Sequence, residues 1–257
     1  MTNFAKILLA IAPHGKPAIR AGFAASLPAA IARADLTTPL RLAHFIAQAA
    51  QESDGFATTT EYASGHAYEG RANLGNTQRG DGPRYKGRGV FQLTGRFNYR
   101  AYGKALGLDL EGNPDLAAAF PDAALIAAEY WKERGLNRYA DRDDIRSVTH
   151  AINGGYNGIS ARQTYLARAK QAIRDNPDEA APPPPPKPAA VPVAPAAKPS
   201  PPKPAPAKPA AKKTAKAAKR PVSAVPSAFD AVHPTDANSA AQIAGAKAKS
   251  AGAKGKP

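Results

Sequence analysis

Two glutamates could carry out acid–base chemistry in this chain. Glu52 follows an apolar run, and Glu61 lies nine residues later in the polar stretch TTTEYASG. At 100° per residue, Glu52 projects near the edge of the apolar helix face. Partial desolvation there favours a protonated carboxyl, as a general acid requires, whereas hydroxyls and water would keep Glu61 ionised. Two carboxylates in contrasting settings are the pair used in glycoside hydrolysis.

Ordinary explanations compete with this hypothesis. Glu52 could pair with an arginine at a helix end, and Glu61 could be a solvated loop residue. A spacing of nine is not a motif by itself, and Glu69 and Asp81 are equally available carboxylates in the same region. The residues alone therefore suggest the pair without establishing it.

The stretch around Glu61 has the composition of a sugar-binding surface. Tyrosines with a stacking face and a polar tip occur at Tyr62, Tyr68, Tyr85, Tyr99 and Tyr102. Neutral hydrogen-bonding groups are supplied by Asn76, Gln78, Gln92, Thr94 and Asn98. GDGPRYKGRG lacks the GxxxxGK[ST] spacing of a phosphate-binding loop, and the dinucleotide fingerprint GxGxxG is absent.

Other catalytic arrangements find little support. The histidines are His14, His44, His66, His150 and His233, and none has a metal-ligand spacing. We expect His44 and His150 to be structural. There is no GxSxG elbow and no cysteine, so a thiol nucleophile and disulfides are excluded. We expect no metal and no cofactor.

Residues 1–177 have the pattern of one mainly α-helical domain. Thr38-Pro39 combines a hydroxyl N-cap with proline at the first helical position. The buried face that follows repeats at i, i+3, i+4 and i+7, at Leu42, Phe45, Ile46 and Ala49. Further helices are predicted over residues 3–12, 97–106, 121–134, 143–152 and 160–173, with one or two short ones around Pro28 in residues 17–33.

Residues 58–95 differ from these helical segments. GNTQRGDGPRYKGRG alone contains five glycines, and apolar periodicity is weak. A long stretch of this kind is usually a functional loop laid over a scaffold. We expect a small hairpin around residues 85–93 within it.

Residues 178–257 form a second segment, rich in Pro, Ala and Lys. Of the 26 prolines in the chain, 18 lie after Ala181. Residues 181–257 contain 13 Lys or Arg and 2 Asp or Glu, and so supply +11 of the net charge of +15. Such a segment cannot bury enough apolar surface to fold, so we predict a disordered cationic tail. It either acts as a solubilising spacer or attaches to an anionic envelope surface, with nucleic acid only a nonspecific partner.

The early apolar run, residues 7–11, is far shorter than the ~20 residues of a transmembrane helix. No convincing cleavage site follows it, so we expect a helix of the fold rather than a signal peptide. The expected location is therefore the cytoplasm until release, followed by action on the cell wall. We expect a monomer.

Four segments together resemble glycoside hydrolase family 19, within the lysozyme superfamily, and most closely its phage endolysin and prophage lysozyme branch. They are RLAHFIAQAAQES, TEYASG, YEGRANLGNTQRGDGPRYKGRG with QLTGRFNY, and INGGYNG with Arg162. They occur in the family's order and cover roughly residues 5–175. The family usually has HES or HET where this chain has QES, so no role passes to Gln51.

The resemblance implies a lysozyme-like α+β fold that is mainly α, with two lobes around a cleft and a long irregular loop insertion. It also implies an inverting mechanism. Glu52 would be the general acid, Glu61 the general base, and Thr94 would hold the attacking water. Substrate would be bound by Gln92, Asn98 and Asn153, and the cleft shaped by Tyr85, Arg88 and Arg162. Inversion requires the two carboxyl groups to be ~6.5–9.5 Å apart.

Three functions remain open at this point. The first is cleavage of β-1,4 bonds in peptidoglycan glycan strands by an endolysin-like enzyme. The second is a chitinase, because chitin is also a β-1,4-linked N-acetylhexosamine chain. The third is a non-enzymatic cationic protein that binds the cell envelope through its tail, although the presence of Glu52, Glu61 and Thr94 argues against it.

Overall fold

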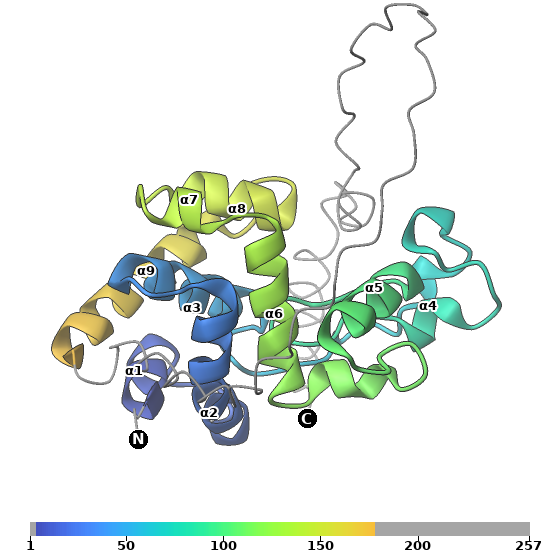
Figure 1. Cartoon of the computed structure of the whole chain (residues 1–257), viewed down its shortest axis with the longest axis horizontal. Helices are drawn as coiled ribbons and strands as arrows, with labels where there is room; N and C mark the ends of the chain where they lie inside the picture. Colours follow the sequence, from blue (N-terminus) through green and yellow to red (C-terminus); the bar gives the residue numbers. More distant parts are fainter. Residues whose placement is uncertain (1–3, 178–257) are drawn as a thin grey trace, which may run out of the picture. The chain divides into compact units, whose positions relative to one another are not determined.

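The computed structural model describes residues 4–177, which form a mainly helical domain (Figure 1). The longer helices are α1 (Phe4–Ile11), α2 (Pro17–Ala34), α3 (Pro39–Glu52), α5 (Arg96–Leu106), α6 (Asp122–Glu133), α8 (Ile145–Asn153) and α9 (Ile159–Asp175). Short elements are α4 (Asp81–Arg84), α7 (Asn137–Ala140) and the 3-10 turns η1 (His66–Tyr68), η2 (Ala72–Leu74) and η3 (Pro114–Ala118). The prediction of a mainly α fold is confirmed. The predicted tail, residues 178–257, lies outside the described residues.

The helices gather in two groups with α6 between them (Figure 1). One group contains α1, α2, α3, α7, α8 and α9, and the other contains α4 and α5. Aromatic rings join α3, α6 and the loop insertion, since Phe45 lies 5.5 Å from both Trp131 and Phe91, centroid to centroid. The core therefore fixes the long loop against the two helices that run through the centre of the domain.

Helix α3 is the central element of the larger group. Thr38 caps it as predicted, because the Thr38 side chain accepts a hydrogen bond from the Arg41 backbone N–H at 3.2 Å. The predicted apolar face is buried, and the helix packs against α9, α8 and α7. The helix ends at Glu52, so this carboxylate stands at the last turn of a rigid, buried scaffold.

The prediction of one or two short helices around Pro28 is wrong about their length. Residues 17–34 form a single helix, α2, with Pro28 inside it. Proline in a helix interior removes a hydrogen bond and costs ~3 kcal/mol. Here Phe23, Leu27 and Ile31, at i, i+4 and i+8, are all buried, and α2 packs along α6. Burial of this face outweighs the local cost of the proline.

The loop insertion is held by a few backbone bridges. Arg88 and Leu93 exchange backbone hydrogen bonds of 3.1 and 2.7 Å, which closes a tight turn within the predicted hairpin region. A second bridge pairs Thr60 with Arg88. Residues 4–177 contain these isolated β-bridges but no β-strand. The segment carrying Glu61 is thus tied to the segment carrying Gln92. In the same described range, no helix has the length and apolarity that crossing a membrane requires.

Candidate active site

Glu52 is positioned by a sharp change of direction at the end of α3. The Ser53 hydroxyl donates to the Ala49 carbonyl at 2.6 Å and accepts from the Phe56 backbone N–H at 3.1 Å. Asp54, Gly55 and Phe56 all have positive φ, at 52°, 65° and 61°. Left-handed backbone is unfavourable for the two non-glycine residues, and strain of this kind often occurs near functional sites. The chain therefore leaves the helix abruptly, with the Glu52 side chain 16% exposed.

Arg162 of α9 is the partner of Glu52. Its Nη2 donates to Glu52 Oε1, its Nη1 donates to Gln48 Oε1, and its Nε donates to the Asn157 carbonyl at 3.3 Å. The Arg162 side chain is only 2% exposed. The prediction that Glu52 has apolar surroundings is therefore wrong, because a buried guanidinium faces the carboxylate. The pairing with an arginine, considered from the sequence as the ordinary alternative, is present, and it orients Glu52.

Glu61 lies in a different setting from Glu52. Its Oε1 accepts from the Tyr68 hydroxyl at 2.9 Å, and its Oε2 accepts from the Gly87 backbone N–H at 3.0 Å. Its own backbone N–H donates to the Gly87 carbonyl at 2.9 Å. Tyr62, the next residue, donates its hydroxyl to Asp54 at 3.3 Å. The Glu61 segment is therefore linked to the segment that follows Glu52.

Gln92, Thr94 and Asn98 lie around the same turn as Glu61. A Cβ built on Gly87 would come within 2.8 Å of Gln92 Oε1 and 3.2 Å of Glu61 Oε2, so both side chains lie close to this glycine. The Thr94 hydroxyl donates to the Gln92 carbonyl at 2.9 Å, and Asn98 Nδ2 donates to the Thr94 carbonyl at 2.7 Å. The structure therefore brings four of the predicted site residues together. Gln92 has a φ of 54°, a second strained position in the site.

Asn153 and Asn98 each have an unsatisfied acceptor. The Oδ1 atoms of both side chains are buried and have no hydrogen-bond partner among the described residues. Buried polar atoms are nearly always paired, so an orphaned acceptor in a candidate site suggests a ligand or water. Asn153 ends α8, and the chain then passes through Asn157 to reach Arg162. Asn153 therefore precedes by four residues the carbonyl that accepts from Arg162, the partner of Glu52.

Tyr85 and Arg88 are both largely buried. They are 2% and 8% exposed, respectively. The Tyr85 hydroxyl donates to the Glu111 carbonyl at 3.0 Å, and Arg88 donates to Asp115 at 2.9 Å. Both side chains support the loop from within, and their role in shaping the cleft stays a prediction. Tyr99 and Tyr102, expected to offer stacking faces, are buried as well.

Glu69 and Asp81, the two competing carboxylates, both bind other groups of the loop insertion. Glu69 accepts from the backbone N–H groups of Gly80 at 2.6 Å and Gly82 at 2.8 Å, and these bonds hold the pKa of its carboxyl below the usual value. Asp81 is buried; although burial alone would raise its pKa, hydrogen bonds from Arg96 and the Gln78 N–H lower it. Both carboxylates organise the loop. Glu61 is therefore the better candidate for a catalytic base.

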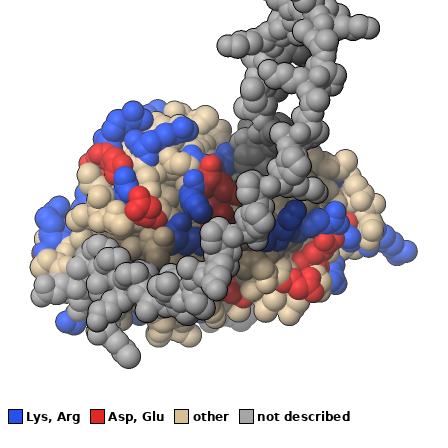
Figure 2. Space-filling view, in the orientation of Figure 1, with Lys and Arg blue, Asp and Glu red and all other residues tan. Residues whose placement is uncertain are grey.

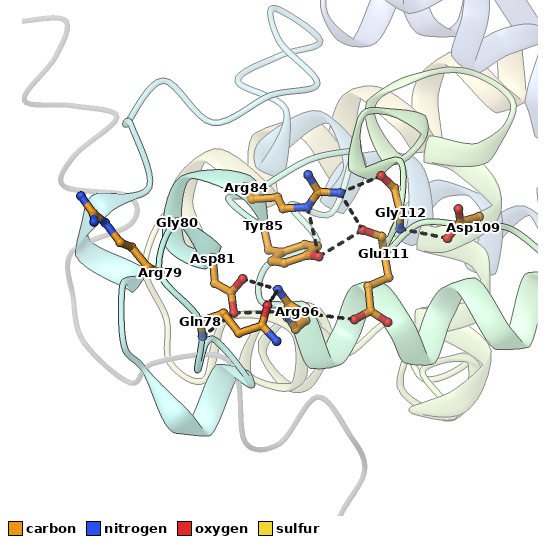
Figure 3. A pocket seen from close by; sticks show the side chains of 10 residues that line it. All are labelled: Gln78, Arg79, Gly80, Asp81, Arg84, Tyr85, Arg96, Asp109, Glu111 and Gly112. Carbon is orange, nitrogen blue, oxygen red and sulfur yellow. Dashed lines mark hydrogen bonds and ion pairs between the residues drawn. The ribbon is translucent and has the colours of Figure 1, made fainter.

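A separate cavity of about 740 Å³ lies between α4 and the segment after α5 (Figure 3). Its arginines bind acceptors within the same lining: Arg96 Nη2 donates to Asp81 Oδ1 at 2.5 Å, and Arg84 donates to the Gly112 carbonyl at 2.7 Å. Figure 3 shows Arg84 and Arg96 on either side of the Tyr85 ring. Neither Glu52 nor Glu61 lines this cavity. These hydrogen bonds give the residues that line the cavity a structural role in the helix group formed by α4 and α5.

Two residues of the site were not assigned their roles from the sequence. Gln48 lies one helical turn before Glu52 and binds the same arginine, a relation that the i, i+4 spacing could have suggested. Tyr68 was considered only as a stacking ring, whereas its hydroxyl binds Glu61. Over residues 4–177, His, Asp and Glu side chains form no group of three or more that could hold a metal ion.

Comparisons with known proteins agree on one family. The sequence profile of glycoside hydrolase family 19, described as chitinase class I, matches residues 19–158. A glycosyl hydrolase family 19 domain-containing protein of Haemophilus influenzae is 39% identical over 102 residues, which are 40% of this chain and 49% of that protein. Endochitinase 1 of Theobroma cacao is 35% identical over 170 residues, covering 54% of this chain and 52% of that protein. This chain thus spans about half the length of these relatives.

The solved structures agree with the sequence matches at the level of the fold. Chitinase C from Streptomyces griseus superposes with a TM-score of 0.55 at 22% identity, covering 68% of this chain and 95% of that one. A class IV chitinase from Zea mays gives a TM-score of 0.52 at 20% identity, covering 68% and 92%. The predicted fold is therefore confirmed.

Proposed function

The chain belongs to glycoside hydrolase family 19, and from this premise we propose that it cleaves β-1,4 bonds in the glycan strands of peptidoglycan by an inverting mechanism. The observation that carries the proposal is the pair of glutamates in contrasting settings. Glu52 faces a buried arginine at a helix end, and Glu61 receives two neutral hydrogen bonds in a loop linked to that helix end. Two carboxylates in linked segments can supply the acid and the base of glycoside hydrolysis, and the acid role of Glu52 and the base role of Glu61 are those that the family resemblance implies.

Glu52 serves as the general acid in this mechanism. Arg162 binds its Oε1, while its Oε2 has no hydrogen-bond partner among the described residues. The free oxygen is the one that delivers the proton to the glycosidic oxygen. Arg162 fixes the direction of that transfer, since Gln48 and Asn157 hold the guanidinium in place. Correct orientation of a reacting group can lower the activation barrier by several kcal/mol.

Glu61 serves as the general base in this mechanism. Each of its oxygens accepts one hydrogen bond, which leaves lone pairs to bind and activate a water. The Thr94 oxygen can accept a hydrogen bond from that water while its hydroxyl donates to Gln92. The separation of the two carboxyl groups, ~6.5–9.5 Å in inverting enzymes, stays a prediction for this chain.

Three amide side chains contribute sugar contacts in this proposal. Gln92 lies beside Glu61, and the orphaned Oδ1 atoms of Asn98 and Asn153 are acceptors for a sugar hydroxyl or an acetamido N–H. An unmet buried acceptor gains a partner when substrate binds, so these contacts add affinity without breaking an existing bond.

A chitinase is the second candidate, because the Theobroma cacao relative is named an endochitinase. Both polymers present the same β-1,4-linked N-acetylhexosamine backbone to Glu52 and Glu61. The third reading, an inert domain with a binding tail, would leave the Glu52–Arg162 and Glu61–Tyr68 arrangement without a use.

Mass spectrometry of digestion products tests the proposal. Purified peptidoglycan and chitin oligomers are treated with the wild-type chain, with Glu52→Gln and with the control Glu133→Gln, whose side chain can still accept from the Tyr102 hydroxyl. We expect muropeptides with new reducing ends from the wild type and the control, and none from Glu52→Gln. Products from chitin alone would establish a chitinase instead. No products from either polymer would overturn the proposed activity.

The place of action and the role of the tail are part of the same proposal. An enzyme of this kind acts on the cell wall, and a cationic tail would increase its concentration on an anionic envelope. Deletion of residues 181–257 should then weaken binding to sacculi much more at low salt than at high salt. Equal loss at both salt concentrations would contradict an electrostatic role.

A further inference from the structure

Two residues of α8 and one residue of the turn that follows it form an exposed aromatic and cationic cluster. Tyr156 is 46% exposed, among the most exposed large apolar or aromatic side chains of the described part of the chain. The Arg146 guanidinium lies 4.2 Å from the centroid of the Tyr156 ring, and the His150 ring lies 5.6 Å from it. Arg146 and His150 are one turn apart on α8. The cation–π contact holds a charged group in a defined place on the surface.

The cluster lies next to the candidate acid. The residue after Tyr156, Asn157, accepts a hydrogen bond from Arg162, and Arg162 binds Glu52. Gly158 packs so closely on Gln51 that an added Cβ would lie 2.8 Å from Gln51 Nε2. The two residues that follow Tyr156 therefore contact Arg162, which binds Glu52, and Gln51, which precedes Glu52 in the sequence.

The Arg146 charge is available to a ligand. No carboxylate of residues 4–177 lies within ion-pair distance of it, although three aspartates precede α8. Each of these is engaged elsewhere: Asp141 with Arg41, Asp143 with His44 and Lys170, and Asp144 with Ser147 as the cap of α8. Figure 2 shows Lys and Arg side chains along the top of the lobe where α7 and α8 lie.

We propose that Tyr156 and Arg146 form a subsite for a carboxylate-bearing sugar, with the ring stacking on the saccharide and the guanidinium pairing with its carboxylate. This inference rests on the proposed glycosidase function and adds its specificity. Each N-acetylmuramic acid carries a free lactyl carboxylate where a peptidoglycan glycan strand has lost its stem peptide, whereas chitin carries no charge. A guanidinium held beside an aromatic ring can pair with that carboxylate, whereas chitin offers it no negative charge. The subsite favours peptide-free stretches of peptidoglycan glycan over chitin.

Binding measurements on a silenced enzyme test this subsite. The full chain carrying Glu52→Gln is titrated with chitotetraose and with a peptide-free glycan tetrasaccharide of alternating N-acetylglucosamine and N-acetylmuramic acid. Arg146→Gln is then added, and the ratio of the two dissociation constants is compared. We expect the preference for the acidic glycan to fall roughly threefold to tenfold, and to fall further at low salt than at high salt.

Arg138→Gln is the matched control. Arg138 is also exposed and lies 4.6 Å from the centroid of the Tyr139 ring, but α7 is tied to the end of α2, where Asn137 Nδ2 donates to the Ala34 carbonyl. Its loss should leave the preference unchanged. An unchanged preference in Arg146→Gln, or an equal fall in Arg138→Gln, would overturn the subsite. Binding of neither ligand by the Glu52→Gln parent would overturn the proposed function, and the subsite with it.

Discussion

Replacement of Gln48 by leucine tests how the candidate acid is held. Gln48 is fully buried, and its Oε1 accepts from the Arg162 guanidinium. Its Nε2 donates to Thr149 at 3.4 Å, a longer and weaker bond. Leucine has a similar size but no polar atoms. The substitution would leave one nitrogen of a buried cation without its acceptor while the surrounding volume stays nearly filled.

The expected loss can be worked out from these contacts. A hydrogen bond to a charged group contributes about 1.5–3 kcal/mol, and Arg162 keeps its bonds to Glu52 and Asn157. We therefore expect the free energy of unfolding to fall by about 2–3 kcal/mol. For a domain of this size that lowers the unfolding midpoint by roughly 4–12 °C. Because Arg162 orients Glu52, kcat should also fall by about tenfold or more at temperatures where the variant is folded.

Thermal unfolding and glycan-cleavage assays measure the two effects. Gln51→Leu is the matched control, since Gln51 is on the same helix, is partly exposed and packs on Gly158. Its midpoint should shift by much less than that of Gln48→Leu. Equal midpoints for the two variants would refute the reasoning, because Arg162 would then not depend on Gln48. A destabilised Gln48→Leu with full kcat would show that this bond does not position Glu52.

Two further predictions concern the loop that carries the candidate base. Tyr68→Phe removes the hydroxyl that binds Glu61, so kcat/KM on glycan should fall by about tenfold with little change in the unfolding midpoint; unchanged kinetics would contradict this role. Asp81→Asn removes the buried carboxylate partner of Arg96, which keeps only Glu111, at 3.4 Å, as an ion-pair partner, and should lower the free energy of unfolding at pH 7 by about 2–4 kcal/mol in urea titrations. Because pairing lowers the Asp81 pKa, its contribution is present above the unfolded value of about 3.9 and is lost as pH falls through the folded value. The gap between wild type and variant should therefore close below about pH 4, and a constant gap would contradict the assignment.

The helices could be predicted because their signals are local. Thr38 caps α3, Gly154 ends α8 in a left-handed conformation, and the apolar repeats marked the buried faces. Pro28 misled the prediction of α2 because its effect is local, whereas the burial that overrides it comes from α6, which is distant in the sequence. The short helices α4 and α7 carry too few residues for a periodic pattern.

The site could be predicted only in part. The family motifs pointed to Glu52, Glu61, Gln92, Thr94 and Asn98, and the structure places the last four around one turn. In an irregular loop, however, burial does not follow any periodicity.

Tyr85 and Arg88 show this limit, since Tyr85 was expected to offer a stacking face and both side chains are largely buried. Likewise, the sequence offered an arginine partner for Glu52 only as a general possibility. Gln48 and Arg162, which are 114 residues apart, meet only in the folded chain.

The configuration of the first product tests the central claim most directly. NMR spectra recorded within minutes of adding the enzyme to a soluble β-1,4-linked N-acetylhexosamine oligomer would show which anomer is released before mutarotation. With Glu52 as acid and Glu61 activating water on the opposite face, the new reducing ends should be α. New β ends would mean retention, and they would contradict the roles proposed here for the two glutamates.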